Sequence, residues 1–545
     1  MKKTTLFTAL LVLVFQLISC SKKKQDIVKK TVLNTVEKTT PKTVHIKQQL
    51  FQENVLKLQA DTTQIHFNYK NKDSILAFYN SRNNKPAWTS IKNRTQLYNA
   101  IKNSYQEGLQ PKEYQIKALE KIQNHPFGKA NNIAIDLLLT DIYLSYAYHL
   151  ANGKIDYKTL HHDWKLPKNK FKYNAILNEG INNTTLSKSL EKFKPKHPIY
   201  QQLKNTLPKY KALINTDSLR TIITHGNKIR PHKSDTRILQ IRKRLQELGI
   251  TTDTINSNSI ISDSLLQKDL KLFQKNKNLA TDAVVGKGTI TELNKSYQDN
   301  YNSILANLER WKWYPRNFGE DHILVNIPNY QLQYNTKKDT THYTVVVGKT
   351  KRKTPVFNAD IKYLVFNPKW HVPPTIKNED IIPAAIKNPS SITRKRITIY
   401  NKEGKRMHPD SIQWNSTAPA TYHYVQSAGR NNALGLVKII FPNKYAVFLH
   451  DTNHRNLFVK NYRARSSGCV RVENPFKLAA EILHWTPKKV DSIIKKRNTK
   501  RIYIQQKTTV YMLYWNVLFN TEDDLPKFIH DVYDFDKKLI EKLTQ

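Results

Sequence analysis

The spacing of hydrophobic and polar residues changes twice along this chain and divides its body into three regions. From about residue 56 to 225, apolar residues recur at helical spacing, most clearly over 133–150, which reads IAIDLLLTDIYLSYAYHL. From about 320 to 500, short β-branched and aromatic runs alternate with polar breaks, as is typical of strands. The pattern therefore predicts a helical region and a mostly β region, with a segment of different texture between them.

The middle segment, residues 226–298, predicts a small helical bundle. One apolar-periodic run ends at Leu248 and is followed by Gly249, a common helix stop. A second run over 270–274 follows, and then a turn around Gly286 leads into a last helix. Taken together, the three regions predict an α+β chain of several domains, which its length also favours.

The β region contains one long interruption. We expect strands at 322–327, 343–347, 363–366, 437–441 and 445–449, and a helix at 475–483. Residues from about 367 to 436 lack a strand pattern and are rich in Pro, Asn and Lys. A loop of this length in a compact domain is usually functional or disordered.

The N-terminus has the features of a bacterial export signal. Met1-Lys2-Lys3 is a basic start, and the apolar run 6–18 is too short for a comfortable membrane span. The run ends in Leu17-Ile18-Ser19-Cys20, which resembles the lipobox of lipoproteins. We therefore predict a signal peptide at 1–19, lipidation of Cys20, and a periplasmic protein anchored in the inner or the outer membrane. An ordinary signal peptide and a short uncleaved anchor are the alternatives.

Composition adds a strong positive charge and a flexible tether. Lys and Arg number 89 against 43 Asp and Glu, which gives a net charge of +46. Export argues against nucleic acid as the partner, whereas the carboxylates of peptidoglycan stems and an anionic bilayer both fit. The lysines are spread through the chain, so a generally solvated basic surface fits as well. Residues 20–55 are rich in Lys, Thr and Gln and predict a flexible tether.

The candidate chemistry lies in the β region. The chain has two cysteines, Cys20 and Cys469, so Cys469 has no disulfide partner in the body of the protein. It stands in the run RSSGCVR at 465–471, and His450 precedes it by 19 positions, at the end of a predicted strand. A lone thiol with an upstream His suggests a catalytic nucleophile and its base. A buried free cysteine acting as a small apolar residue is the alternative.

The residues beside Cys469 suit acyl transfer. A free thiol is mostly protonated at neutral pH, so Cys469 needs a base or a lowered pKa. Main-chain N–H groups at Gly468 and Cys469 can converge on an oxyanion, and Gly468 lets a carbonyl approach closely. Arg465 and Arg471 can favour the thiolate or hold a substrate carboxylate.

Residues 320–500 resemble the YkuD-type L,D-transpeptidase catalytic domain. The resemblance rests on His450-Asp451-Thr452 and on Ser466-Ser467-Gly468-Cys469-Val470-Arg471. Ser467 stands where the family usually has His, a departure typical of its long branch with a scaffold domain. The resemblance implies that His450 is the base and that the main-chain carbonyl of Asp451 orients it, in preference to the Asp451 carboxylate.

The resemblance also implies an architecture and further substrate contacts. It implies a helical scaffold domain at 56–225, a peptidoglycan-binding-like bundle at 226–298, a catalytic domain at 299–500 with a substrate-capping loop at about 371–436, and a C-terminal extension at 501–545. Arg471, Ser467, Trp414 and Asn432 are the expected substrate-binding residues. Trp414 could instead be packing, and Arg471 could be a structural cap.

The implied activity is formation of peptidoglycan cross-links between third-position diamino acids, through a thioester on Cys469 and with release of D-Ala. The partners would be a tetrapeptide donor, a diamino-acid acceptor and cell-wall synthesis proteins, with no cofactor. No metal is expected, since His450 and His454 lack the Glu of a zinc motif. A carboxypeptidase, a cysteine peptidase acting on stem peptides, and a peptidoglycan-binding lipoprotein that anchors membrane to wall are the alternatives.

Overall fold

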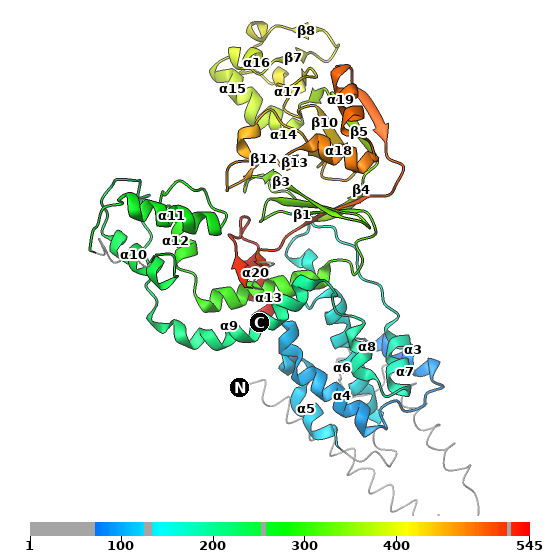
Figure 1. Cartoon of the computed structure of the whole chain (residues 1–545). Helices are drawn as coiled ribbons and strands as arrows, with labels where there is room; N and C mark the ends of the chain where they lie inside the picture. The colour runs from blue at the N-terminus through cyan, green and yellow to red at the C-terminus, as the bar shows by residue number, and fades with distance from the viewer. Residues whose placement is uncertain (1–70, 125–132, 252–257, 520–524) are drawn as a thin grey trace, which may run out of the picture. The chain divides into compact units, whose positions relative to one another are not determined.

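The computed structural model describes residues 71–124, 133–251, 258–519 and 525–545. The predicted signal peptide, Cys20 and the tether lie outside the described residues. The chain forms two compact units (Figure 1). The first comprises Met1–Lys154, Lys168–Tyr200 and Trp311–Trp313, and the second Ile155–Pro167, Gln201–Arg310 and Tyr314–Gln545.

The first unit is helical around one apolar core. Its helix α6 is apolar on nearly every side and is therefore buried, with Tyr143 and Leu139 fully enclosed. Asp136 of this helix accepts hydrogen bonds from the main-chain N–H groups of Ala87 and Trp88, which ties the preceding loop to the core. The helices are α3 (Lys72–Ser81), α4 (Ile91–Lys102), α5 (Ile116–Ile122), α6 (Ile133–Asn152), α7 (Tyr173–Asn182) and α8 (Leu186–Glu191).

The second unit begins with helices. Three of them, α10 (Arg237–Glu247), α11 (Ser264–Asn276) and α12 (Lys287–Leu293), enclose a small core that includes Ile241, Leu270 and Leu293. Leu248 follows α10, and Gly249 has the left-handed backbone (φ +66°) of a helix stop. The longer helices α9 (Pro198–Leu213) and α13 (Tyr297–Trp313) flank this bundle in the sequence.

A large sheet forms the rest of the second unit. Within the described residues it has 11 strands in the order β14-β5-β10-β11-β13-β3-β2-β1-β15-β4, with β12 beside β3. Helices α18 (Pro475–Leu483) and α19 (Pro487–Lys495) follow β13 in the chain. The strands are β1 (His322–Asn326), β2 (Gln331–Asn335), β3 (Thr340–Gly348), β4 (Phe357–Asp360), β5 (Tyr363–Phe366), β10 (Val437–Ile440), β11 (Leu449–His450), β12 (Ala464–Ser466), β13 (Val470–Val472), β14 (Lys500–Tyr503) and β15 (Thr509–Leu513).

The expected α+β multidomain architecture is confirmed, and one predicted strand is wrong in its first part. Of 445–449, only Leu449 belongs to a strand. Ala446 has a left-handed backbone (φ +53°), and Asn443 Oδ1 accepts the N–H groups of Tyr445 and Val447, so a turn replaces the ladder. The segment after residue 500 is part of the sheet, because β15 lies between β1 and β4.

The predicted long loop is a folded lobe, which we call the capping lobe (residues 370–426). It has its own four-stranded sheet, β6 (Trp370–His371), β9 (His423–Gln426), β7 (Ile397–Tyr400) and β8 (Arg406–Met407). Its short helices include α14 (Pro374–Ile376), a π-helical turn (Lys377–Ile381), α15 (Ile382–Lys387), α16 (Ser390–Arg394) and α17 (Ala418–Thr421). They share an apolar core with the strands. The prediction missed this fold because each element is too short to show a period.

No helix among the described residues is long and apolar enough to span a membrane.

Candidate active site

The sheet register brings His450 and the Cys469 motif together. Strands β11 and β13 are parallel neighbours in which Leu449 pairs with Val470 and His450 pairs with Arg471. Paired residues point to the same face of a sheet, and alternate residues point to opposite faces. Leu449 and Val470 therefore point to one fully buried face, whereas Cys469 and Arg471 share the opposite face with His450.

His450 is held as a neutral base. Its imidazole is buried, and Nδ1 lies 2.5 Å from the main-chain carbonyl of Asp451. A carbonyl can only accept, so Nδ1 carries the proton and Nε2 keeps a free lone pair. Burial and, next, the charge of Arg471 lower the pKa of His450 to about 3. The imidazole is therefore uncharged at neutral pH.

The carboxylate of Asp451 is engaged elsewhere. Its Oδ2 accepts the N–H of Leu436 at 2.9 Å, and both oxygens accept from Arg455. Gly435 makes room for it, because a Cβ at Gly435 would lie 2.2 Å from Asp451 Cγ. Gly435 also has a left-handed backbone (φ +59°). The carboxylate thus fixes the backbone of Asp451, and the carbonyl remains for His450.

The Cys469 thiol is half-buried and protonated in this state. Its Sγ lies 3.7 Å from the carbonyl oxygen of Ala446. Burial raises the pKa of Cys469 to about 11, against smaller lowering effects of a Phe448 backbone hydrogen bond and the charges of Arg471 and Lys438. The site therefore holds a neutral thiol and a neutral imidazole, an arrangement in which a thiolate can form by proton transfer to His450.

The residues that carry the thiol, 466–469, form what we call the catalytic turn. Ser466 Oγ donates to the Cys469 carbonyl at 2.6 Å and accepts the Gly468 N–H at 3.1 Å. Gly468 has a positive φ of +114°, which only Gly adopts readily. The expected oxyanion role of the Gly468 N–H conflicts with its bond to Ser466, which occupies this donor. The main-chain N–H of Cys469, which has no acceptor among the described residues, is the better candidate.

A loop after β3 stabilises the catalytic turn through a hydrogen bond to the Gly468 carbonyl. Thr354 is fully buried, and its Oγ1 donates to the Gly468 carbonyl at 2.7 Å while accepting the Gly348 N–H at 2.9 Å. The hydroxyl of Tyr533 accepts the Thr354 N–H at 3.1 Å and donates to the Gly348 carbonyl at 2.6 Å. Sequence reasoning missed these residues, because no local motif joins positions 354 and 533.

Arg471 and Ser467 lie beside Cys469 in the chain, and their role as substrate contacts stays a prediction. Arg471 is half-buried, and no carboxylate among the described residues lies within ion-pair distance of it. A partly buried guanidinium without a carboxylate partner suits an incoming anion. Ser467 is exposed, and its Oγ accepts a hydrogen bond from Arg352 at 2.9 Å. Arg465 is exposed and donates to the carbonyl of Tyr462.

Trp414 and Asn432 have structural contacts here, which fits the packing alternative for Trp414, and their substrate binding stays a prediction. Trp414 is 7% exposed inside the core of the capping lobe, and its indole N–H donates to the carbonyl of Pro409. Asn432 is buried, and its Nδ2 donates to the carbonyls of Pro368, Gln426 and Ser427 while its Oδ1 accepts the Leu434 N–H. Their side chains therefore stabilise the lobe and its connection to the sheet.

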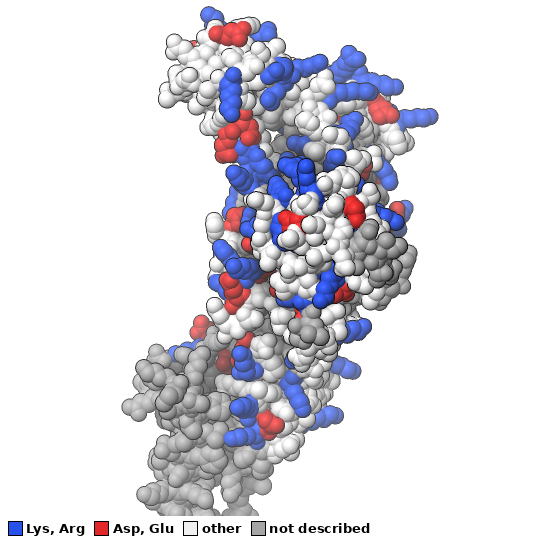
Figure 2. Space-filling model, turned by 90° about the vertical axis from the view of Figure 1, so that its left-hand side faces the viewer, with Lys and Arg blue, Asp and Glu red and all other residues white. Residues whose placement is uncertain are grey.

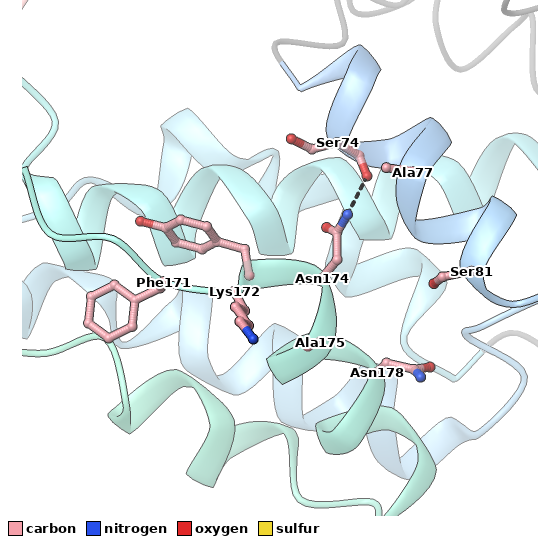
Figure 3. A pocket seen from close by; sticks show the side chains of 9 residues that line it. Ser74, Ala77, Ser81, Phe171, Lys172, Asn174, Ala175 and Asn178 are labelled. Atoms are coloured by element: carbon pink, nitrogen blue, oxygen red, sulfur yellow. Dashed lines mark hydrogen bonds between the residues drawn. The ribbon is translucent and has the colours of Figure 1, made fainter.

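A separate pocket of about 590 Å³ lies in the first unit, between α3 and α7 (Figure 3). Asn174 reaches from α7 toward α3 and donates to the carbonyl of Ser74. The lining holds no Cys, His or acid, so it suggests no catalytic chemistry. The lining residues are Ser74, Ala77, Ser81, Phe171, Lys172, Tyr173, Asn174, Ala175 and Asn178.

Basic side chains are spread over the surface. Figure 2 shows Lys and Arg distributed across the visible face, with few acidic residues between them. This distribution matches the net charge of +46 and forms no single block. It favours association with anionic polymers in general without selecting one.

Comparison with known families agrees with this geometry. Residues 320–504 match the model of the L,D-transpeptidase catalytic domain (YkuD). The chain carries an L,D-transpeptidase catalytic domain. His450 and the catalytic turn lie within it, and residues 73–207 match the model of the scaffold domain.

A curated relative extends the likeness. A protein of Haemophilus influenzae described as "Putative L,D-transpeptidase" is 34% identical to this chain over 223 residues. The matched segment covers 40% of this chain and 45% of that relative, so the chain spans under half of the relative's length. The peptidoglycan-binding role of 226–298 stays a prediction.

Proposed function

We propose that this protein is a cell-wall L,D-transpeptidase that forms peptidoglycan cross-links through a thioester on Cys469. The observation that carries the proposal is the tautomer of His450. The Asp451 carbonyl holds the Nδ1 proton, so the Nε2 lone pair is free on the strand beside Cys469. This pair lies inside the segment that matches the catalytic domain.

The reaction follows from these groups. His450 Nε2 takes the thiol proton as Cys469 Sγ attacks the carbonyl carbon of the third, diamino-acid residue of a tetrapeptide stem. The Cys469 N–H stabilises the oxyanion, and Arg471 holds a stem carboxylate. The C–N bond to D-Ala breaks, and His450 returns the proton to the leaving amine. The side-chain amine of a second stem then attacks the thioester, loses a proton to His450, and releases the thiol.

The setting of the reaction is part of the proposal. The lipobox-like Leu17-Ile18-Ser19-Cys20 supports lipidation at Cys20 and a periplasmic protein anchored to a membrane that faces the wall. The basic surface supports an approach to the carboxylate-rich wall.

Mass spectrometry of purified protein incubated with disaccharide-tetrapeptide tests the proposal, with Cys469→Ala as the matched control. We expect a dimer lighter than two substrates by one D-Ala, absent from the control. Loss of D-Ala without a dimer would indicate a carboxypeptidase, and cleavage of added dimer would indicate a peptidase. No product, together with retained binding to sacculi, would contradict the proposal and favour the anchoring lipoprotein.

A further inference from the structure

One guanidinium contacts both the catalytic turn and the capping lobe. Arg352 Nη1 donates to Ser467 Oγ at 2.9 Å, within the catalytic turn. The same side chain pairs with Glu379 Oε2 at 2.7 Å and with Asp380 Oδ2 at 2.5 Å, both in the capping lobe. Arg352 therefore joins three segments that are distant in the sequence.

The contact uses most of the donors of the guanidinium. Nε also donates to Glu379 at 3.1 Å, and Nη2 also donates to Asp380 Oδ1 at 3.0 Å. Only 10% of the Arg352 side chain is exposed, against 60% for Glu379 and 40% for Asp380. A planar fork can meet two carboxylates and a hydroxyl at once, which the single ammonium of Lys cannot do.

Arg352 offsets the repulsion between the adjacent carboxylates of Glu379 and Asp380. Glu379 and Asp380 are adjacent in the π-helical turn Lys377–Ile381 between α14 and α15, and π-turns are frequent at functional sites. Two neighbouring carboxylates repel each other unless a cation lies between them. Asp380, and then Glu379, raise the pKa of Arg352, as a shared ion pair requires.

The topology places the Cys469 site between two attachments of the lobe. The chain enters the lobe after β5 and leaves it before β10, and these two strands are paired. Arg352 follows β3, which lies on the far side of β11 and β13 in the strand order. The lobe is thus joined covalently on one side of the strands that carry His450 and Cys469, and through Arg352 on the other.

We propose that Arg352 is a positioning residue that holds the capping lobe closed and couples its position to the catalytic turn. The inference rests on the proposed function for its purpose, since the catalytic turn that Arg352 joins to the lobe carries the proposed nucleophile. When the capping lobe moves away, the ion pairs of Arg352 with Glu379 and Asp380 break. Arg352 can then move together with Ser467, so the conformation of the catalytic turn depends on the position of the lobe.

Hydrogen exchange of residues 374–387 in the full chain tests whether Arg352 holds the capping lobe, and it needs no transpeptidase activity. The variants are Arg352→Gln, the double variant Glu379→Gln/Asp380→Asn, and all three changes together. Lys351→Gln is the control, because it removes the same charge from the exposed residue immediately before Arg352. We expect Arg352→Gln and the double variant each to exchange about five- to thirty-fold faster, because charge-assisted hydrogen bonds contribute more than exposed ion pairs, with no further gain in the triple variant.

Salt and thiol reactivity separate the two parts of the inference. Raising NaCl from 0.05 to 0.5 M should speed exchange in the wild type but not in Arg352→Gln. The alkylation rate of Cys469 by iodoacetamide should rise in the same variants. A wild-type exchange rate in Arg352→Gln, or increases in exchange rate that multiply in the triple variant, would overturn the proposal that Arg352 holds the capping lobe. Faster exchange with unchanged alkylation would overturn the coupling to the turn. Neither result bears on whether the enzyme forms cross-links.

Discussion

The hydroxyl of Tyr533 offers a direct test of how the catalytic turn is held. It joins the Thr354 N–H and the Gly348 carbonyl, and Thr354 in turn holds the Gly468 carbonyl at 2.7 Å. Tyr533→Phe removes this hydroxyl alone and keeps the ring that packs against Phe535. The change is made far from Cys469 in the sequence, in the C-terminal segment.

The expected magnitude follows from burial. Gly348 and Thr354 are both buried, so the variant leaves one carbonyl and one N–H without a partner. Each such group costs about 1–3 kcal/mol, so the free energy of unfolding should fall by about 2–6 kcal/mol. A displacement of about 1 Å at reacting groups can cost a hundredfold in rate. We therefore expect the acylation rate of Cys469 to fall by about 10- to 100-fold.

Two measurements on the same protein check this reasoning. Urea unfolding gives the change in free energy, and single-turnover mass spectrometry of the acyl-enzyme gives the rate. Tyr503→Phe is the control, because Tyr503 is 65% exposed on β14 and should change neither quantity. A stability loss with a wild-type acylation rate would refute the view that this hydroxyl positions the turn. Unchanged stability would refute the burial argument.

Two further predictions concern the pair of reacting groups. Gly435→Ala places a Cβ 2.2 Å from the Asp451 carboxylate at a positive φ, so we expect the acylation rate of Cys469 to fall at least about a hundredfold. Gly404 also has a positive φ but has nothing within 4 Å of its added Cβ. Gly404→Ala should therefore lower the free energy of unfolding by the backbone strain of about 1 kcal/mol and leave the acylation rate unchanged. An equal fall in the acylation rate of both variants would show that backbone strain alone is responsible. Because burial raises the pKa of Cys469 to about 11, its alkylation by iodoacetamide should rise about tenfold per pH unit from pH 7 to 10. A plateau below pH 8 would show a thiolate at rest.

The sequence predicted the elements whose information is local. Strands with runs of β-branched residues, such as 363–366, were confirmed at β5, and the helix at 475–483 was confirmed as α18. His450 and Cys469 could be named because a lone thiol and a strand-end His carry their own chemical signal. The register that pairs β11 with β13 then places both on one face, a result that the chain order alone does not give.

What could not be predicted depends on tertiary contacts. Trp414 and Asn432 look like substrate contacts in a polar segment, but the lobe folds and uses them internally. Arg352 is one of 89 basic residues, and nothing near it in the sequence marks it. Thr354 and Tyr533 are 179 positions apart, so their hydrogen bond has no local signature.

Under the proposed function, the electrostatics of the resting site would give the substrate a part in its own activation. Burial and, after it, the charge of Arg471 lower the pKa of His450 and so weaken it as a base. A stem carboxylate paired with Arg471 would cancel much of that charge and raise the pKa of His450 again. The proton could then pass more readily from Cys469. Without a substrate, both groups stay neutral and the thiol reacts slowly with other electrophiles. Under the proposed function, Cys469 would therefore become reactive mainly when an anionic stem is present.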